Sequence, residues 1–235
     1  MYNPWHGCHK KSEGCLNCYM FSFDKKRGID SNIFRITKDF ELPLKKNRAG
    51  KFKLESGSHV MMCLTSDFFL EEADCYRDKV WQMILQRQDV VFEIITKRVE
   101  RINQCLPNNF KKLFKNVLIN VTVENQIRAD ERLPILIDLD LPYKGVVASP
   151  LLEKIDIEKY LISGKIDKVT VGGENYQNAR ALDFSWVKDL ARQCKKHNVE
   201  FEFYDTGRNF IKDGKSYIIP HSLGKIQAKK AQKLL

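Results

Sequence analysis

The sequence lacks any apolar run long enough to cross a membrane. Its longest apolar stretches, such as residues 60–64, fall far short of the roughly 18 to 20 residues that a membrane helix needs. Its first residues, MYNPWHGC, also lack the basic and then apolar order of a secretory signal. Only seven prolines and twelve glycines occur among the 235 residues, and 43% of the residues are hydrophobic, which excludes collagen-like and disordered classes. We therefore expect a soluble, cytoplasmic chain with one sizeable core and no membrane partner.

Cysteine is present in an odd number, seven, which argues against a disulfide framework in a reducing compartment and leaves metal binding or buried thiols. Three of them, Cys8, Cys15 and Cys18, lie within eleven residues near the N-terminus. The other four lie singly in apolar strand or helix patterns, and we expect them to be buried, unreactive thiols: Cys63, Cys75, Cys105 and Cys194.

Acidic residues are outnumbered, because 30 Asp and Glu stand against 40 Lys and Arg, a formal net charge of +10. Such an excess favours polyanionic partners, including nucleic acid. The solvated surface of a lysine-rich protein carries the same excess, so charge alone leaves both interpretations open. Two stretches are distinctly basic: residues 19–57, predicted to be an insertion with a helix followed by a loop, and residues 224–235, predicted to be a terminal helix with a solvated basic face.

Short β-branched runs alternate with longer amphipathic stretches from about residue 58 onward. This alternation predicts six strands, over residues 59–65, 90–96, 117–123, 145–149, 168–171 and 199–204. The clearest helices between them are predicted over residues 74–86 and 185–197. The pattern predicts an α/β fold with a parallel sheet and outer helices, either doubly wound or a whole or partial barrel. We favour one domain over residues 1–235, a (β/α)6-like partial TIM barrel.

Polar residues follow every predicted strand. Any one such turn is ordinary loop chemistry. Because parallel strands end at one edge of a sheet, all six together predict a polar, partly acidic mouth where ligands bind. The residues at these ends are Ser66 and Asp67, Lys97 and Arg98, Glu124, Ser149, Gly172 to Glu174, and Asp205.

The three N-terminal cysteines have the spacing C-x6-C-x2-C, and two of them form a C-x-x-C turn. Three thiolates can coordinate one metal centre, and no fourth cysteine lies nearby in the sequence. A structural zinc site would need His6 or His9 to complete four ligands. An iron-sulfur cube held by Cys8, Cys15 and Cys18 would instead keep one iron open to a ligand. Cysteines without a metal are the third alternative.

The segment around these cysteines resembles the radical S-adenosylmethionine (SAM) superfamily, whose members carry three cysteines near the start of a partial strand-helix barrel. Residues 3–8, NPWHGC, and the Cys18-Tyr19 pair are similar to the flanks in its spore photoproduct lyase-like branch. The superfamily spacing is usually C-x3-C-x2-C, so the first spacing here is three residues longer. A closer resemblance is to a phage and bacterial family of uncharacterised three-cysteine proteins, and it covers residues 3–19, 65–69, 95–98, 120–126, 149–152 and 171–174.

The radical SAM resemblance implies a [4Fe-4S] cluster on Cys8, Cys15 and Cys18, with S-adenosyl-L-methionine on the open iron. It implies reductive cleavage of that cofactor to a 5′-deoxyadenosyl radical, with electrons from an external flavodoxin or ferredoxin type donor. The cofactor-binding candidates are Ser66 and Asp67 for the methionine amino group, Thr122 and Glu124 for the ribose, Ser149 for the adenosine, and Gly172, Gly173 and Glu174 as a mouth element with close backbone approach. The catalytic candidates are Lys97, to hold an anionic substrate group, and Tyr204 and Asp205, for a radical relay or a proton transfer.

The leading hypothesis is therefore a radical SAM iron-sulfur enzyme acting on a small molecule, a nucleotide or a nucleic acid. The alternative is a zinc-containing protein that binds nucleic acid or another partner without radical chemistry. A catalytically inactive barrel that binds a partner is a third hypothesis.

Overall fold

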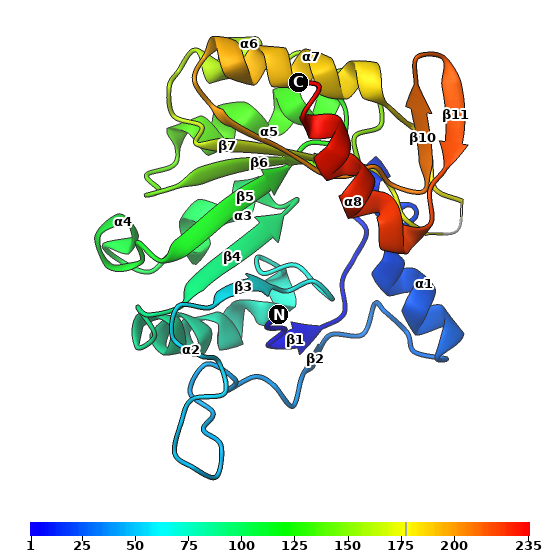
Figure 1. Ribbon diagram of the computed structural model, residues 1–235. Coiled ribbons are helices and arrows are strands. Elements are labelled where there is room, and N and C mark those ends of the chain that lie inside the picture. Colours follow the sequence, from blue (N-terminus) through cyan, green and yellow to red (C-terminus); the bar gives the residue numbers. More distant parts are fainter. Residues whose placement is uncertain (177) are drawn as a thin grey trace. The chain divides into compact units, whose positions relative to one another are not determined.

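All six predicted strands are present in the computed structural model, which describes residues 1–176 and 178–235 (Figure 1). They form a six-stranded sheet in the order β3-β4-β5-β6-β7-β9, and every boundary lies within three residues of its prediction. The strands are β3 (His59–Met62), β4 (Val91–Thr96), β5 (Val117–Thr122), β6 (Lys144–Ala148), β7 (Lys168–Gly172) and β9 (Glu200–Asp205). The predicted α/β class with a parallel sheet and helices between the strands is confirmed.

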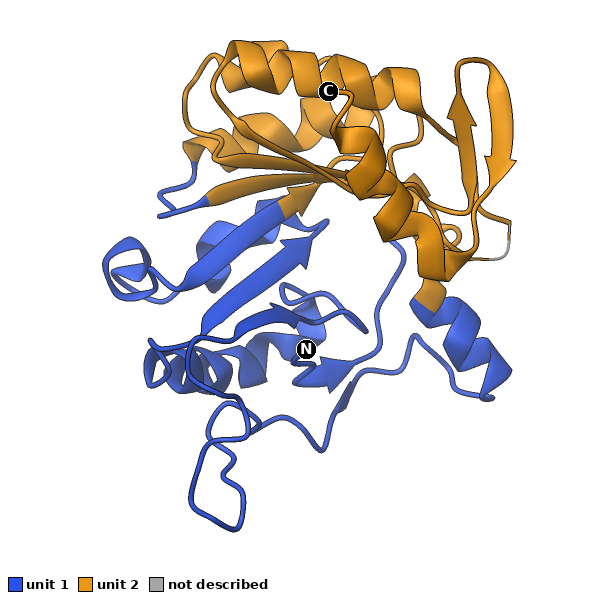
Figure 2. Ribbon diagram, in the orientation of Figure 1, with its two compact units in different colours: residues 1–11, 20–120, 139–143 blue, residues 12–19, 121–138, 144–235 orange. Residues whose placement is uncertain are grey.

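The chain divides into two units, coloured separately in Figure 2. Unit 1 comprises Met1–Lys11, Met20–Asn120 and Leu139–Tyr143. Unit 2 comprises Ser12–Tyr19, Val121–Asp138 and Lys144–Leu235. The three N-terminal cysteines are therefore divided, because Cys8 belongs to unit 1 and Cys15 and Cys18 belong to unit 2.

In unit 1, β3 runs parallel to β4, with His59 opposite Val91 and Met62 opposite Ile94. Its core is aromatic: the ring of Trp81 lies 4.7 Å from that of Phe68, centroid to centroid. The helical elements are η2 (Glu71–Ala73), α2 (Asp74–Leu85), α3 (Val99–Cys105), α4 (Phe110–Leu113) and, apart from its first residue, α1 (Tyr19–Lys26). The basic stretch 19–57 contains α1 and the short β2 (Arg35–Ile36), which pairs with β1 (Trp5–His6) and so adds a strand that the sequence did not indicate.

In unit 2, β7 lies between β6 and β9 and is parallel to both. The helix α7 (Phe184–Lys196) begins where the Asp183 carboxylate accepts a hydrogen bond from the Ser185 backbone N–H at 2.8 Å. Its apolar face, with Leu190 and Cys194 fully buried, covers the core. The remaining elements are the helix α5 (Gln126–Asp138) and the shorter η1 (Glu13–Cys15), α6 (Glu158–Leu161) and β8 (Leu182–Asp183).

Unit 2 ends in a β-hairpin and a helix (Figure 1). β10 (Asn209–Lys212) pairs antiparallel with β11 (Lys215–Ile218), and β10 also pairs with β8. The helix α8 (His221–Gln232) begins directly after Pro220, three residues before the predicted start at Gly224. Gly224 lies inside the helix, where a Cβ would come within 2.2 Å of Asp205 Oδ1, so glycine allows the close approach of α8 to Asp205. Among the described residues, no helix combines the length and apolar character needed to cross a membrane.

Candidate functional site

The residues before Cys8 fix the path of the chain in unit 1. Asn3 accepts a hydrogen bond from the Thr65 backbone N–H at its side-chain oxygen, over 3.2 Å. Trp5 is fully buried and donates its indole N–H to the Asp67 carbonyl at 3.2 Å. His6 Nε2 lies 2.7 Å from a carboxylate oxygen of the buried Asp24. The run before Cys8, which resembles the segment before the first cysteine in the radical SAM branch, therefore also fixes the local backbone through these contacts.

Gly7 is required by its surroundings. Its φ is +102°, a backbone conformation that residues other than glycine rarely adopt, and a Cβ would lie 2.4 Å from the Ile33 carbonyl oxygen. The Ser66 hydroxyl donates to the Gly7 carbonyl, and the Cys8 N–H donates to the Ser31 carbonyl at 2.8 Å. The predicted cofactor residue Ser66 thus holds the turn that leads to the first cysteine.

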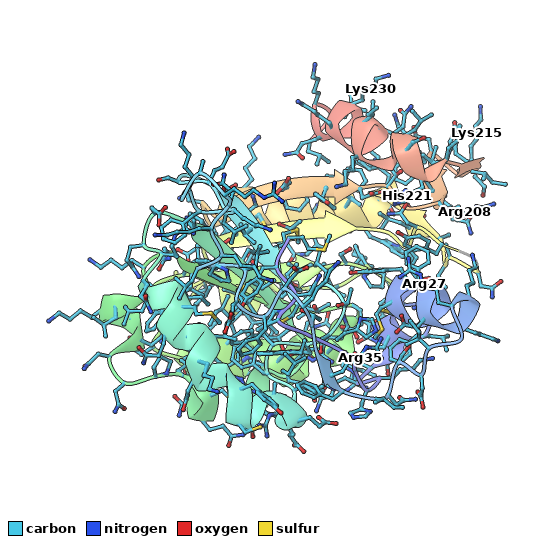
Figure 3. The ribbon with its side chains drawn as sticks, turned by 90° about the horizontal axis from the view of Figure 1, so that it is seen from below. Arg27, Arg35, Arg208, Lys215, His221 and Lys230 are labelled. Carbon is cyan, nitrogen blue, oxygen red and sulfur yellow. The ribbon has the colours of Figure 1, made fainter. Side chains whose placement is uncertain are left out.

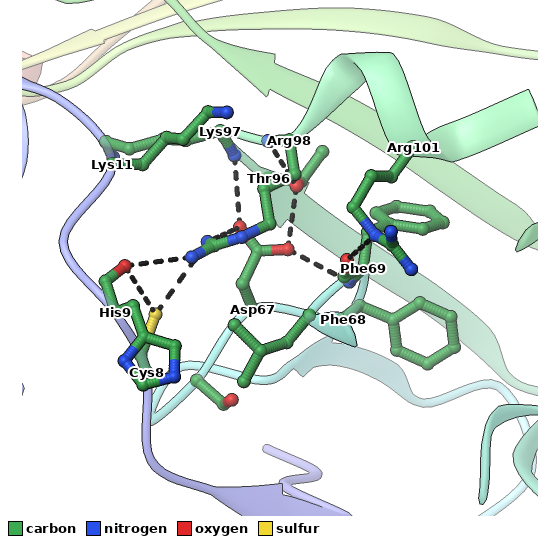
Figure 4. A network of polar contacts seen from close by, with 12 residues as sticks. Cys8, His9, Lys11, Asp67, Phe68, Phe69, Thr96, Lys97, Arg98 and Arg101 are labelled. Carbon is green, nitrogen blue, oxygen red and sulfur yellow. Dashed lines mark hydrogen bonds and ion pairs between the residues drawn. The ribbon is translucent and has the colours of Figure 1, made fainter. Parts of the chain in front are cut away.

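A buried network surrounds the predicted residue Asp67 (Figure 4). One carboxylate oxygen accepts from the Thr96 hydroxyl at 2.8 Å and from the Phe69 N–H at 2.9 Å. The other accepts from the Arg98 guanidinium at 3.1 Å and from the Lys97 N–H at 3.2 Å. Four donors therefore occupy the carboxylate, and Lys97 takes part through its backbone.

Arg98 connects this network to the first cysteine. Its guanidinium donates to the His9 carbonyl at 2.9 Å, and Nη1 lies 3.9 Å from Cys8 Sγ (Figure 4). Burial lowers the pKa of Arg98, but the charges of Asp67 and of a Cys8 thiolate raise that pKa more, so it ends above its ordinary value. Unit 1 thus presents Cys8 with a fixed cation beside its sulfur.

In unit 2, a compact turn carries the other two cysteines. The Cys15 N–H donates to the Ser12 carbonyl at 2.9 Å, and the Cys18 N–H donates to the Cys15 carbonyl at 3.4 Å. The fully buried Glu124 carboxylate accepts from the Ser12 hydroxyl and, at 3.2 Å, from the Gly14 N–H. The turn is thereby hydrogen-bonded to the second residue after β5.

Arg132 on α5 neutralises Glu124 with an ion pair of 2.9 Å, and the exposed fractions of the two side chains are 1% and 0%. The same guanidinium nitrogen donates to the Thr122 carbonyl at 2.7 Å. Three buried atoms here have no hydrogen-bond partner among the described residues: Thr122 Oγ1, Arg132 Nε and Arg132 Nη2. They retain unused capacity to bind a polar group.

Two further ion pairs hold the cysteine turn in unit 2. Glu174 accepts from Asn17 at 2.9 Å and from the Arg180 N–H at 2.7 Å, and it pairs with the Arg180 guanidinium. Burial raises the pKa of Glu174, but the Arg180 hydrogen bonds lower it more, so it ends below its ordinary value. Glu13 meets Arg128 through two contacts of 3.0 Å, and those hydrogen bonds lower the pKa of Glu13 to about 2.

The other predicted residues lie at the ends of β6, β7 and β9. A Cβ on Gly172 would come within 2.8 Å of Ser149 Oγ, and one on Gly173 within 2.6 Å of the Thr206 carbonyl, so both glycines permit the expected close approach. Asp205 is buried and accepts from the Gly207 N–H at 2.9 Å. Its neighbour Tyr204 is 38% exposed, because successive strand residues face opposite sides of the sheet. This alternation separates the two predicted catalytic side chains.

Several positioning residues escaped the sequence analysis: Glu13, Asn17, Arg128, Arg132 and Arg180. The sequence pattern could have identified Arg132, because this residue falls at a core position in the apolar stripe that Ala129, Leu133 and Leu136 form on α5. A charged residue in such a stripe indicates a buried partner. The others lie in loops or at positions that are at least partly exposed, with no comparable pattern.

All seven cysteines carry thiols, and the expectation for the four scattered ones needs correction. Cys63 and Cys194 are buried as predicted, and burial raises the pKa of Cys194 to about 12. Cys75, in contrast, is exposed, and Cys105 is half-buried. Cys75 lies in the first turn of α2, on the side opposite the buried Val80 and Ile84. Within residues 1–176 and 178–235, no group of three or more His, Cys, Asp or Glu side chains is arranged to hold a metal ion.

Comparison with known proteins identifies one family. The family model described as a protein of unknown function, DUF5131, matches residues 1–234. No solved structure matches the chain.

Proposed function

The chain belongs to the DUF5131 family, and we propose that it is a radical SAM type enzyme in which Cys8, Cys15 and Cys18 hold a [4Fe-4S] cluster. The observation that supports this most is the anchoring of the cysteines. Each cysteine-bearing segment is tied, within its own unit, to buried charged residues that follow strands of the sheet. We take the six-stranded sheet to be a partial (β/α)6 barrel, in which such strand ends would form the mouth.

The support for this cluster is the chemistry of the three thiols, since the described residues show no side chains already gathered as a metal site. Thiolates are the ligands that iron-sulfur clusters take, and three of them leave one iron open. Arg98 supplies a hydrogen-bond donor beside Cys8 Sγ, and donors to cluster sulfurs raise the reduction potential. When bound, the reduced cluster and S-adenosyl-L-methionine together supply the electron transfer that cleaves the sulfonium carbon bond and gives a 5′-deoxyadenosyl radical.

The chain's own residues would bind and orient the cofactor. Thr122 Oγ1 and the two unpartnered nitrogens of Arg132 would donate hydrogen bonds to ribose or carboxylate oxygens, since a buried polar atom without a partner costs about 1–3 kcal/mol that a ligand recovers. Glu124 and Glu174 would keep the cysteine turn rigid. Lys97 is the candidate to hold an anionic substrate group. Tyr204 is the candidate for contact with substrate, whereas Asp205 would hold the turn that follows β9.

Anaerobic reconstitution with iron and sulfide tests the proposal. We expect a brown protein with about four irons per chain, which forms 5′-deoxyadenosine when it is reduced in the presence of S-adenosylmethionine. Cys15→Ala should lose both the colour and the product. Cys75→Ala is the matched control, because this exposed thiol lies outside the motif and its loss should change neither.

Two outcomes would contradict the proposal. A colourless protein that retains one zinc per chain would favour the alternative of a structural zinc site. A Cys15→Ala variant with a full complement of iron would show that the motif is not the ligand set.

A further inference from the structure

The C-terminal part of unit 2 carries a concentration of positive charge. Residues 206–235 contain seven lysines and arginines but only one acidic residue, Asp213. Six of these cations are exposed on or directly next to the β10–β11 hairpin and α8, and we name them the C-terminal basic face: Arg208, Lys215, Lys225, Lys229, Lys230 and Lys233. Figure 3 shows Lys215 extending outward from the hairpin and Lys230 from α8.

These cations have no acidic partners in the described chain, whereas several other lysines of unit 2 are paired with carboxylates. Elsewhere in the unit, Lys154 pairs with Asp189 at 2.6 Å and Lys159 pairs with Asp130 at 3.0 Å. Lys196 pairs with a carboxylate as well. Within the described chain, no member of the C-terminal basic face forms an ion pair. Their charges are uncompensated, so they project a positive potential that attracts an anionic partner.

The spacing of the lysines on α8 produces a row. Gly224, Ala228 and Ala231 are its buried residues. Lys225, Lys229 and Lys233 follow one another at intervals of four, which on a helix places them about 6 Å apart along one side. Such a row suits a linear polyanion with regularly repeated charges.

Aromatic side chains stand among these cations. Tyr217 on β11 is 44% exposed, and it lines a groove of about 280 Å³ between the hairpin and α8 together with Lys230 and Gln227. Lys225 lies over the ring of the half-exposed Tyr204, with its Nζ 4.3 Å from the ring centroid. Exposed rings beside a row of cations are the combination that binds single-stranded nucleic acid, because cations contact phosphates and rings stack on bases.

We propose that the C-terminal basic face binds single-stranded nucleic acid, with the phosphate backbone along the lysine row of α8 and a base stacked on Tyr217. A membrane surface fits less well, since the exposed apolar side chains of α8 are only Leu223 and Ile226, beside three exposed lysines, and do not form a broad apolar strip. The proposal does not depend on the cysteines, so it holds for a protein with or without a cluster.

Fluorescence anisotropy with a labelled 20-nucleotide oligothymidine tests this surface on the full-length protein. If all six cations contact phosphates, the slope of log affinity against log salt is about −4, so affinity should fall about 300-fold between 50 and 200 mM salt. The variant Lys225→Gln/Lys229→Gln/Lys233→Gln should halve that slope. Tyr217→Ala should weaken binding at least about fivefold and leave the slope unchanged.

The matched control is Lys154→Gln/Lys159→Gln/Lys196→Gln. It removes the same net charge from the same unit, but from lysines that already have acidic partners. Affinity within about twofold of the parent is expected, and an equal loss in both triple variants would overturn the assignment to this face. Equal or tighter binding of a 20-base-pair duplex, or of phosphatidylserine vesicles, would overturn the assignment to a single strand. Cys15→Ala should bind as the parent does, which separates this test from that of the cluster.

Discussion

The buried pair of Glu124 and Arg132 gives the sharpest prediction about the cysteine turn. One Glu124 oxygen accepts from Ser12 and Gly14, and the other accepts from Arg132. In Glu124→Gln the new amide nitrogen must face a donor in either orientation, so at least one hydrogen bond is lost. The guanidinium also loses its counter-charge at an exposed fraction of only 1%. Breaking a buried pair in this way costs about 3–5 kcal/mol, so we expect the free energy of unfolding to fall by that amount.

Urea unfolding followed by tryptophan fluorescence measures this loss. Glu131→Gln is the matched control, because Glu131 also pairs with an arginine of α5, Arg128, but both side chains are partly exposed. An exposed pair contributes about 0.2–1 kcal/mol, so the control should remain close to the parent. The double variant Glu124→Gln/Arg132→Met removes both charges and should be more stable than Glu124→Gln alone.

A second measurement locates the effect. The Gly14 N–H donates to Glu124, so its amide hydrogen exchange should accelerate in Glu124→Gln and remain unchanged in Glu131→Gln. A Glu124→Gln variant within about 1 kcal/mol of the parent, with Gly14 still protected, would refute the view that this carboxylate organises the turn.

Two further predictions follow from neighbouring contacts. Gly7→Ala should lower the free energy of unfolding by at least about 2 kcal/mol, because the new Cβ would lie 2.4 Å from the Ile33 carbonyl oxygen. Gly50 also has a positive φ, but a Cβ there would meet nothing within 4 Å, so Gly50→Ala should lose only about 1 kcal/mol. Equal losses of the two variants in thermal unfolding would contradict the steric argument. The Glu13–Arg128 pair lowers the folded-state pKa of Glu13 from 4.5 to about 2, so its contribution is complete above pH 4.5 and disappears as pH falls toward 2. Glu13→Gln should therefore flatten the stability profile in that window, and an unchanged profile would exclude the pair as a cause of acid sensitivity.

Much of the fold was predictable, because each buried parallel strand appears in the sequence as a short β-branched run. This local pattern does not depend on which strands lie beside it in the sheet. The β10–β11 hairpin was also predictable in principle. Asp213 and Gly214 both have positive φ, 51° and 73°, and an Asp-Gly pair between two short extended runs is the usual signal of such a turn. It was missed because the flanking runs are rich in lysine and isoleucine without clear alternation.

The contacts of the cysteine turn could not be predicted in the same way. Ser12 meets Glu124 across 112 residues, and Asn17 meets Glu174 across 157. No local propensity encodes such pairings, since they exist only after the strands are in place. The sequence could indicate that polar residues gather at strand ends, but not which of them the chain itself would engage.

That distinction bears on how a cofactor would bind. Four donors of the chain itself occupy the Asp67 carboxylate, and Glu124 and Glu174 are likewise engaged, so a ligand that approached these oxygens would have to displace existing hydrogen bonds. Thr122 Oγ1 and the free nitrogens of Arg132 have no partner to displace in the described chain. Of the buried residues predicted to bind the cofactor, Thr122 is therefore the one whose unused hydrogen-bonding capacity a ligand could take up at least cost. Thr122→Val, which removes the hydroxyl but keeps the shape, is the substitution that isolates this contribution.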